Sequence, residues 1–267
     1  MRLIPILALA AALPAAAPVA AQTTQPVATP SNPAPAATTW PIKEGEVTLP
    51  AFRFKTGEAM DVQMHYTTLG TPHRGADGTI DNAVMVLHGT GGTGKQFLQP
   101  QFADELYGPG QPFDIRTTYV ILPDNIGHGA SSKPSDGKRM AFPKYDYDDM
   151  VAGQKAMLEK IGVTQLKVIL GTSMGCMHGF VWGETYPGFA ERLAPFACLT
   201  VPIAGLNRMW RKMTIDAIQA DPAWSDGNYT KQPEQGLRTA SSLSIIAGAN
   251  PLALQKLYPT PLPPRAF

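Results

Sequence analysis

The residues best suited to chemistry lie in the segment GTSMG, where Gly171 and Gly175 flank Ser173. The segment follows an apolar run at residues 166–170 and precedes a helical pattern that extends to about Tyr186. In this strand–turn–helix context, a G-x-S-x-G sequence holds a nucleophilic serine on a strained turn above a sheet edge. The N–H groups at the start of the helix can then stabilise the oxyanion of acyl transfer. A chance match on an ordinary turn is the alternative, but the flanking pattern favours a serine nucleophile.

A second glycine-rich segment, LHGTGG at residues 87–92, ends another apolar run. A turn of this kind can offer a second backbone N–H to the oxyanion. Two phosphate-binding interpretations compete for it, because residues 89–94 fit G-x-G-x-x-G and residues 89–95 fit most of a phosphate loop. The phosphate-loop pattern fails at Gln96, where Ser or Thr is required. A dinucleotide site would need an acidic residue at the end of the next strand, about 20 residues on, and none is found there. The oxyanion interpretation is therefore favoured.

A third segment, PDNIGHGASSKP at residues 123–134, also follows a predicted strand. It could line a site, or it could form a tight turn in which Asp124 and Asn125 bond their own backbone. The structural turn is favoured for Asp124, and the role of His128 is left open.

Several elements must position these three segments. Alternating residues predict strands at 46–54 and 61–69, and continuous apolar runs predict buried strands at 83–87, 118–122, 166–170 and 193–201. Helical spacing is found at 96–106, 147–161, 206–220 and in the stretch after residue 173. Buried strands that alternate with helices indicate an α/β fold, a parallel sheet with helices on both faces.

LHGTGG, PDNIGHGASSKP and GTSMGC, in that order, resemble the α/β-hydrolase fold, and more narrowly its homoserine O-acetyltransferase-like branch. Residues 215–237 resemble the start of the helical lid of that branch, and the likeness runs from about Glu46 to Leu237. The resemblance implies a mostly parallel sheet flanked by helices, with a core at residues 43–202. A partial helical lid at 203–257 would follow the sixth strand.

The resemblance also implies the roles of site residues. Ser173 would be the nucleophile that forms an acyl-enzyme, and the N–H groups of Thr90 and Met174 would be the oxyanion donors. Gly171 and Gly175 would be the elbow glycines. No metal or organic cofactor is implied, and the partner would be a small-molecule ester.

Two departures from the branch favour an ester hydrolase over an O-acetyltransferase that uses acetyl-CoA. The acetyltransferases carry an arginine where this chain has Ser241, although Arg238 is nearby. They are also expected in the cytoplasm, whereas this chain has features of export. An inactive remnant or binding module is the third alternative. The oligomeric state is left open, with a homodimer through the lid as one candidate.

The N-terminal residues 1–21 predict a signal peptide, with Arg2 before an apolar stretch and Val19-Ala20-Ala21 before the cleavage point. Prolines break this stretch, which argues against a membrane anchor and predicts a periplasmic or secreted protein without stable membrane insertion. Residues 22–42 are rich in Ala, Pro and Thr and predict a disordered linker. The net charge of +1 gives no reason to expect nucleic acid.

A serine nucleophile needs a histidine and an acid, which follow it along the chain in this fold. His178 is the only histidine after Ser173, and its place on the same helix predicts a packed or surface residue. The aspartates Asp216, Asp221 and Asp226 lie in the expected lid. The chain is therefore expected to lack its last core strands and two triad members, as a fragment or frameshift product. A further 80–120 residues, roughly, would complete one domain, and the Pro-rich residues 258–267 would be an out-of-frame tail.

Two smaller predictions concern Cys176 and Cys198 and the lid side chains. Both cysteines lie in apolar surroundings, which favours buried free thiols over catalysis or a disulfide. The large lid side chains fit an acyl pocket and a lid core equally well; they are Met209, Trp210, Met213 and Trp224.

Overall fold

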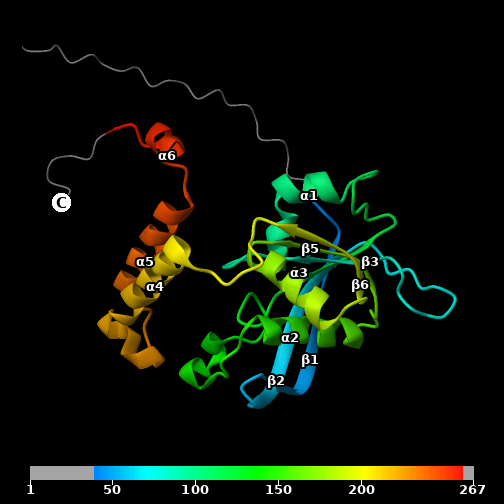
Figure 1. Ribbon diagram of the computed structural model, residues 1–267, viewed down its shortest axis with the longest axis horizontal. Coiled ribbons are helices and arrows are strands. Elements are labelled where there is room, and N and C mark those ends of the chain that lie inside the picture. Colours follow the sequence, from blue (N-terminus) through cyan, green and yellow to red (C-terminus); the bar gives the residue numbers. More distant parts are fainter. Residues whose placement is uncertain (1–38, 261–267) are drawn as a thin grey trace, which may run out of the picture. The chain divides into compact units, whose positions relative to one another are not determined.

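The computed structural model describes residues 39–260. Its centre is a six-stranded sheet in the order β1-β2-β4-β3-β5-β6 (Figure 1). Strands β1 and β2 are antiparallel, as are β2 and β4, and the others pair in parallel. Their bounds are Ile42–Arg53, Ala59–Leu69, Ala83–Leu87, Tyr119–Pro123, Leu166–Thr172 and Ala190–Phe196 for β1 to β6. The predicted α/β class, with a mostly parallel sheet, is confirmed.

The helices follow the predicted order, with bounds that depend on local residues. They are α1 (Pro100–Leu106), α2 (Tyr147–Lys160), α3 (Met174–Thr185), α4 (Gly205–Gln219), α5 (Glu234–Gly248) and α6 (Pro251–Leu257). Short 3-10 helices are η1 (Gly94–Leu98), η2 (Pro134–Asp136), η3 (Arg139–Ala141) and η4 (Pro222–Gly227). The single helix expected at 96–106 is divided into η1 and α1, because Pro100 cannot continue a helix but can begin one.

The last strand also differs from the prediction. The strand expected at 193–201 spans Ala190–Phe196 instead. Ala197 adopts a φ of 57°, which turns the chain away from the ladder directly after Phe196.

Two hydrophobic clusters hold the sheet between helices. Alternate residues of β3 point to opposite faces, so Met85 and Leu87 pack on the side of α2 and α3. Val84 and Val86 pack on the other side with Tyr107 and neighbouring aromatic residues of η1 and α1. The two covered faces explain why the parallel strands are continuous apolar runs.

The strand register brings the three glycine-rich segments to one edge. Met85 of β3 pairs with Ile121 of β4, and Leu87 of β3 pairs with Gly171 of β5. Since parallel strands end on the same side of a sheet, the segments that follow β3, β4 and β5 meet there. This edge is where ligands bind in open α/β sheets.

The folded chain begins slightly earlier than the expected residue 43. The ring of Trp40 packs edge-on against Tyr107, with ring centroids 5.7 Å apart, and β1 begins at Ile42. The predicted signal peptide, most of the linker and the end of the tail lie outside the described residues. Across residues 39–260, no helix has the length and apolarity that a membrane crossing requires.

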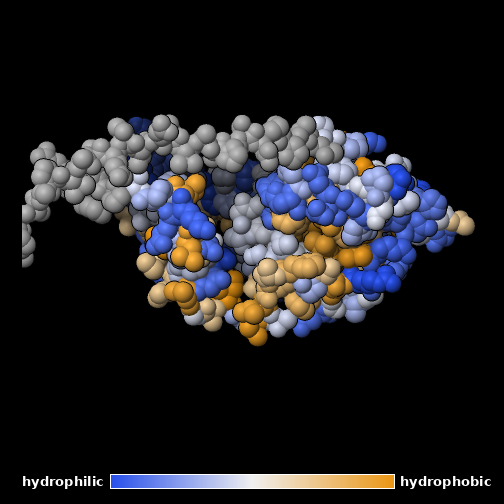
Figure 2. Space-filling view, turned by 90° about the horizontal axis from the view of Figure 1, so that it is seen from above, coloured by the Kyte–Doolittle hydropathy of each residue, from blue (hydrophilic) through white to orange (hydrophobic). Residues whose placement is uncertain are grey.

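Helices α4 to α6 lie within residues 203–257, the stretch predicted to be a partial lid and called the predicted lid below. Helices α4 and α5 lie side by side (Figure 1). Gly236 permits this approach, because a Cβ there would lie 2.6 Å from the Ala217 carbonyl oxygen. Figure 2 shows apolar side chains at the molecular surface. The exposed apolar residues of the predicted lid include Leu206, Ile246 and Leu252.

Candidate active site

Ser173 occupies a strained turn between β5 and α3. Its φ is 52° and its ψ is −113°, a conformation that costs a non-glycine residue about 1–3 kcal/mol. The Ser173 N–H donates to the Phe196 carbonyl oxygen at 3.0 Å, which ties the turn to β6. The side chain is exposed at the sheet edge. Such stored strain in an exposed serine is typical of a nucleophile elbow.

The two flanking glycines allow three backbone segments to meet at this turn. A Cβ on Gly171 would lie 2.1 Å from the Gly175 carbonyl oxygen. A Cβ on Gly175 would lie 2.2 Å from the carbonyl oxygen of Leu87, the last residue of β3. Strands β3 and β5 and the start of α3 therefore pack at distances that only glycine permits.

The Thr90 loop and the start of α3 present two unused donors beside the serine. Thr90, Ser173 and Met174 line one cavity of about 160 Å³. Within the described chain, neither the Thr90 N–H nor the Met174 N–H forms a hydrogen bond. The Met174 N–H belongs to the first turn of α3, where N–H groups lack helical partners and favour negative charge. The two donors can therefore stabilise an oxyanion formed on a carbonyl that Ser173 attacks.

The rest of the cavity wall is formed by residues that were not among the predicted site residues. They are Tyr147, Met177, Ala197, Cys198, Leu199, Ile203, Ala204, Asn207 and Arg211. Met177 could have been found, because it lies one helical turn after Ser173. None of the four large side chains of the predicted lid lines this cavity. Met209 and Met213 are about half exposed, at 55% and 45%, and Trp224 lines a separate pocket.

The glycine-rich loop after β3 does not take the form of a phosphate site. The Lys95 ammonium pairs with the Glu44 carboxylate of β1 at 2.5 Å, so its charge is already engaged by a carboxylate. The Gly89 N–H is occupied, because it donates to the Gln96 side-chain oxygen at 3.1 Å. Gln96 stands where a phosphate loop would need Ser or Thr, and its side chain anchors the loop instead.

Asp124 has the structural role favoured for it. Its buried carboxylate accepts the N–H groups of Gly94 at 2.8 Å and Ala130 at 2.9 Å, and it lies 2.9 Å from the His65 ring nitrogen. For Asn125, neither of the two alternatives had been favoured, and its side chain does not bond its own turn. It bonds the His88 ring at 2.9 Å, because the ends of β3 and β4 are neighbours.

His178 is a packed residue, as one of its two interpretations held. It is fully buried, lies edge-on to the Tyr147 ring at 4.9 Å and bonds Gln154. Burial, followed by the nearby His88 and His128, lowers the pKa of His178 to about 3. In the described residues, no histidine or carboxylate bonds the Ser173 hydroxyl. Nor do three potential metal-ligating His, Cys, Asp or Glu side chains come together anywhere between residues 39 and 260.

We expect the free energy of unfolding to decrease as the pH falls, because of His178. The pKa in the folded state, about 3, lies below that of an unfolded histidine, about 6.5. The unfolded chain therefore binds the extra proton first, and stability present above about pH 6.5 is lost as the pH falls towards about 3, by up to ~1.4 kcal/mol per pH unit. Urea unfolding at several pH values should show a smaller slope for His178→Gln. The exposed His73→Gln variant is the control, and an unchanged slope in His178→Gln would refute the assignment.

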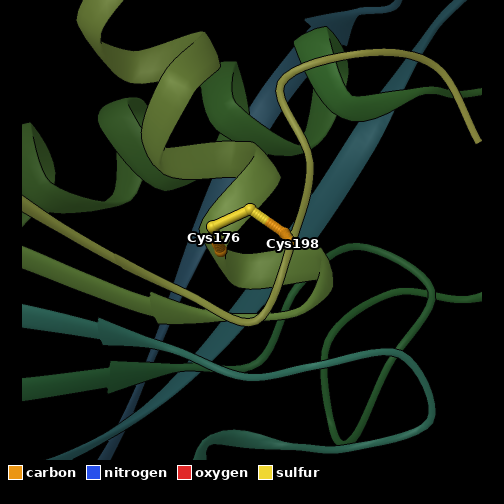
Figure 3. Close-up of a disulfide and its surroundings, with 2 residues drawn as sticks. All are labelled: Cys176 and Cys198. Atoms are coloured by element: carbon orange, nitrogen blue, oxygen red, sulfur yellow. A yellow bond between two sulfur atoms is a disulfide. The ribbon is translucent and has the colours of Figure 1, made fainter.

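The prediction of two free thiols was wrong. Cys176 and Cys198 form a disulfide that joins the first turn of α3 to the segment after β6 (Figure 3). The two Cα atoms lie 6.0 Å apart, within the range of ordinary disulfides. The 22-residue separation concealed the pairing, because only the parallel β5–β6 ladder makes the two positions neighbours.

Removing this disulfide should lower the free energy of unfolding by about 3 kcal/mol, from the entropy of closing a loop of this length. Denaturant unfolding of the Cys176→Ala/Cys198→Ala variant would measure the loss. A thiol reductant should destabilise the native chain by a similar amount and leave the double variant unaffected. Equal stability of the oxidised native chain and the double variant would contradict this expectation.

Comparison with known proteins gives consistent relatives. The family described as alpha/beta hydrolase fold matches residues 82–259. A homoserine O-acetyltransferase of Moorella thermoacetica is 35% identical over 185 residues, which are 62% of this chain and 49% of that protein. The chain thus spans about half the length of this curated relative.

Solved structures with the same fold include a transferase and an esterase. The homoserine O-acetyltransferase of Bacillus anthracis superposes with a TM-score of 0.72 at 24% identity, over 82% of this chain and 64% of that one. The acetyl esterase MekB superposes with a TM-score of 0.70 at 25% identity, over 80% of this chain and 61% of that one.

Proposed function

Because this chain belongs to the α/β-hydrolase fold family, we propose that Ser173 is the nucleophile of an acyl-transfer reaction on carboxylic esters. One observation carries the proposal: the strained, exposed serine shares a cavity with two backbone N–H groups that have no other partner in the described chain. Relatives named as acyltransferases and as esterases support the same kind of chemistry.

In the proposed reaction, the Ser173 oxygen attacks the ester carbonyl and the Thr90 and Met174 N–H groups stabilise the resulting oxyanion. Collapse of this intermediate expels the alcohol and leaves an acyl-enzyme. The serine proton must pass to a base, and residues 39–260 place no such group on Ser173, so the acid and base are not assigned. A cavity of about 160 Å³ favours a short acyl group.

We favour water over a second hydroxyl as the acceptor, so that the reaction is hydrolysis. The chain would be incubated with a short-chain ester, and separately with acetyl-CoA and homoserine, with products identified by mass spectrometry. Free acid from the ester without any added acceptor supports the hydrolase. Acetyl-homoserine as the only product would instead support the O-acetyltransferase, which the names of the relatives favour. A Ser173→Ala variant controls for both reactions.

We also propose that the protein acts outside the cytoplasm, in the periplasm or after secretion. The Cys176–Cys198 disulfide supports this, because such bonds persist in oxidising compartments. Expression of the whole sequence in a bacterium, followed by mass spectrometry, should find the exported protein beginning at Gln22. Retention of residues 1–21 in the cytoplasm would contradict the proposal.

A further inference from the structure

The segment directly after β6 forms part of the cavity beside Ser173 but has few attachments to the core. This segment, residues 197–203, is called the wall segment below, and it is neither helix nor strand. Within the described chain, its backbone forms no hydrogen bond, and none of its residues belongs to either hydrophobic cluster. The wall-segment residues that line the cavity of about 160 Å³ are Ala197, Cys198, Leu199 and Ile203.

One covalent link joins the wall segment to the helix that begins after Ser173. Cys176 lies in the first turn of α3 and is only 2% exposed, whereas Cys198 belongs to the wall segment (Figure 3). Their Cα atoms lie 6.0 Å apart, and a disulfide keeps this distance within about 4.4–6.8 Å. The disulfide therefore fixes the position of the wall segment relative to the proposed nucleophile.

A second, larger cavity adjoins the first. It has a volume of about 590 Å³ and is lined mostly by apolar side chains, including Phe180 and Val181 of α3. The residues that line both cavities are Tyr147, Met177, Leu199 and Ile203. Because Leu199 and Ile203 belong to the wall segment, displacement of this segment would enlarge the first cavity towards the second. A long apolar chain would then fit beside Ser173.

We propose that the Cys176–Cys198 disulfide determines acyl specificity, because it holds the wall segment in place and so confines the serine cavity to short acyl groups. This role rests on the proposed function, which makes the cavity the acyl site. The disulfide takes no part in bond making or breaking and acts through the position of the wall segment. When the link is broken, a segment without backbone hydrogen bonds is free to move, and longer apolar acyl groups gain access.

The test compares two fluorophosphonates, one with a methyl group and one with an octyl group on phosphorus. Each phosphonylates the serine oxygen with loss of fluoride, and its alkyl group takes the place of the acyl chain. Peptide mapping gives the labelling rate at Ser173. The octyl-to-methyl ratio of rates should be about tenfold higher in Cys176→Ala than in the oxidised native chain, since one methylene in an apolar pocket is worth about 10–200-fold. Cys176 does not line the cavity, so this variant changes no lining side chain.

Reduction of the native chain gives the same comparison without a substitution, and so it serves if Cys176→Ala does not fold. A dithiol closes into its own disulfide as each cysteine sulfur takes up one hydrogen. The ratio should again rise, whereas the dithiol should not change it in the double variant Cys176→Ala/Cys198→Ala. Val151→Ala controls for loss of stability, because Val151 is fully buried on α2 and lines neither cavity. It should keep the native ratio.

Equal ratios in the oxidised and reduced native chain, or the same rise in Val151→Ala, would overturn the proposal. A second readout needs no reaction at Ser173. The Ala197 methyl carbon is bonded directly to the backbone, so its NMR order parameter reports motion of the wall segment. It should fall in Cys176→Ala but not in Val151→Ala, and an unchanged value in Cys176→Ala would also overturn the proposal. If neither probe labels Ser173 in the native chain, the proposed function is refuted, while the order parameter still tests the disulfide.

Discussion

Replacing Gly175 by alanine should prevent the core from folding stably. The new Cβ would lie 2.2 Å from the Leu87 carbonyl oxygen and 2.7 Å from the Leu87 Cβ. Leu87 cannot move aside easily, because it is the last residue of β3 and pairs with Gly171 of β5. Overpacking against fixed backbone costs at least about 3 kcal/mol, a large share of the roughly 5–15 kcal/mol that stabilises a domain. Circular dichroism during urea unfolding would measure the loss.

Gly179 provides the matched control on the same helix. A Cβ at Gly179 meets nothing within 4 Å. Because alanine is the better helix former, Gly179→Ala should raise the free energy of unfolding by about 0.5–1 kcal/mol. A Gly175→Ala variant as stable as the native chain would show that β3, β5 and α3 do not pack as described.

Replacing Ser173 by alanine should remove acylation of the chain by an activated acetyl ester. In the native chain, the strained turn exposes Ser173 beside the unpaired N–H groups of Thr90 and Met174. Each such donor accelerates acyl transfer by about 10²–10³-fold, and an ordinary surface serine lacks both. Acetylation of the Ser173→Ala chain should therefore be slower by at least about 10²-fold. Intact mass measured over time after addition of the ester gives both rates.

The control is Ser135→Ala, an exposed serine in a different pocket. It should be acetylated at the native rate. If Ser173→Ala and Ser135→Ala react equally fast, Ser173 has no special reactivity.

The parts of this fold that could be predicted are those encoded by neighbouring residues. Apolar runs marked the buried strands, and the combination of run, glycines and helix marked Ser173, because strand, turn and helix periods are read within about ten residues. Pro100 divided a predicted helix, which a stricter use of the same local rule would have anticipated.

The parts that could not be predicted depend on which strands become neighbours. Cys176 meets Cys198 only because β6 pairs with β5. Asn125 meets His88, 37 residues away, only because β4 lies beside β3. Without knowledge of the strand order, local rules could offer Asn125 no partner beyond its own turn, and they predicted free thiols for the two cysteines. In the folded chain, Cys198 lines the cavity beside Ser173, and Asn125 bonds His88 next to the glycine-rich loop.

The most direct test of Ser173 as the nucleophile is covalent labelling of the chain with a fluorophosphonate. Even where a member of the catalytic triad is missing, oxyanion donors and binding retain about 10³–10⁴-fold acceleration in serine hydrolases. We therefore predict that one phosphonyl group is added, that peptide mapping places it on Ser173, and that Ser173→Ala is not labelled. Absence of labelling in the folded native chain, or labelling spread over other serines, would contradict the assignment of Ser173.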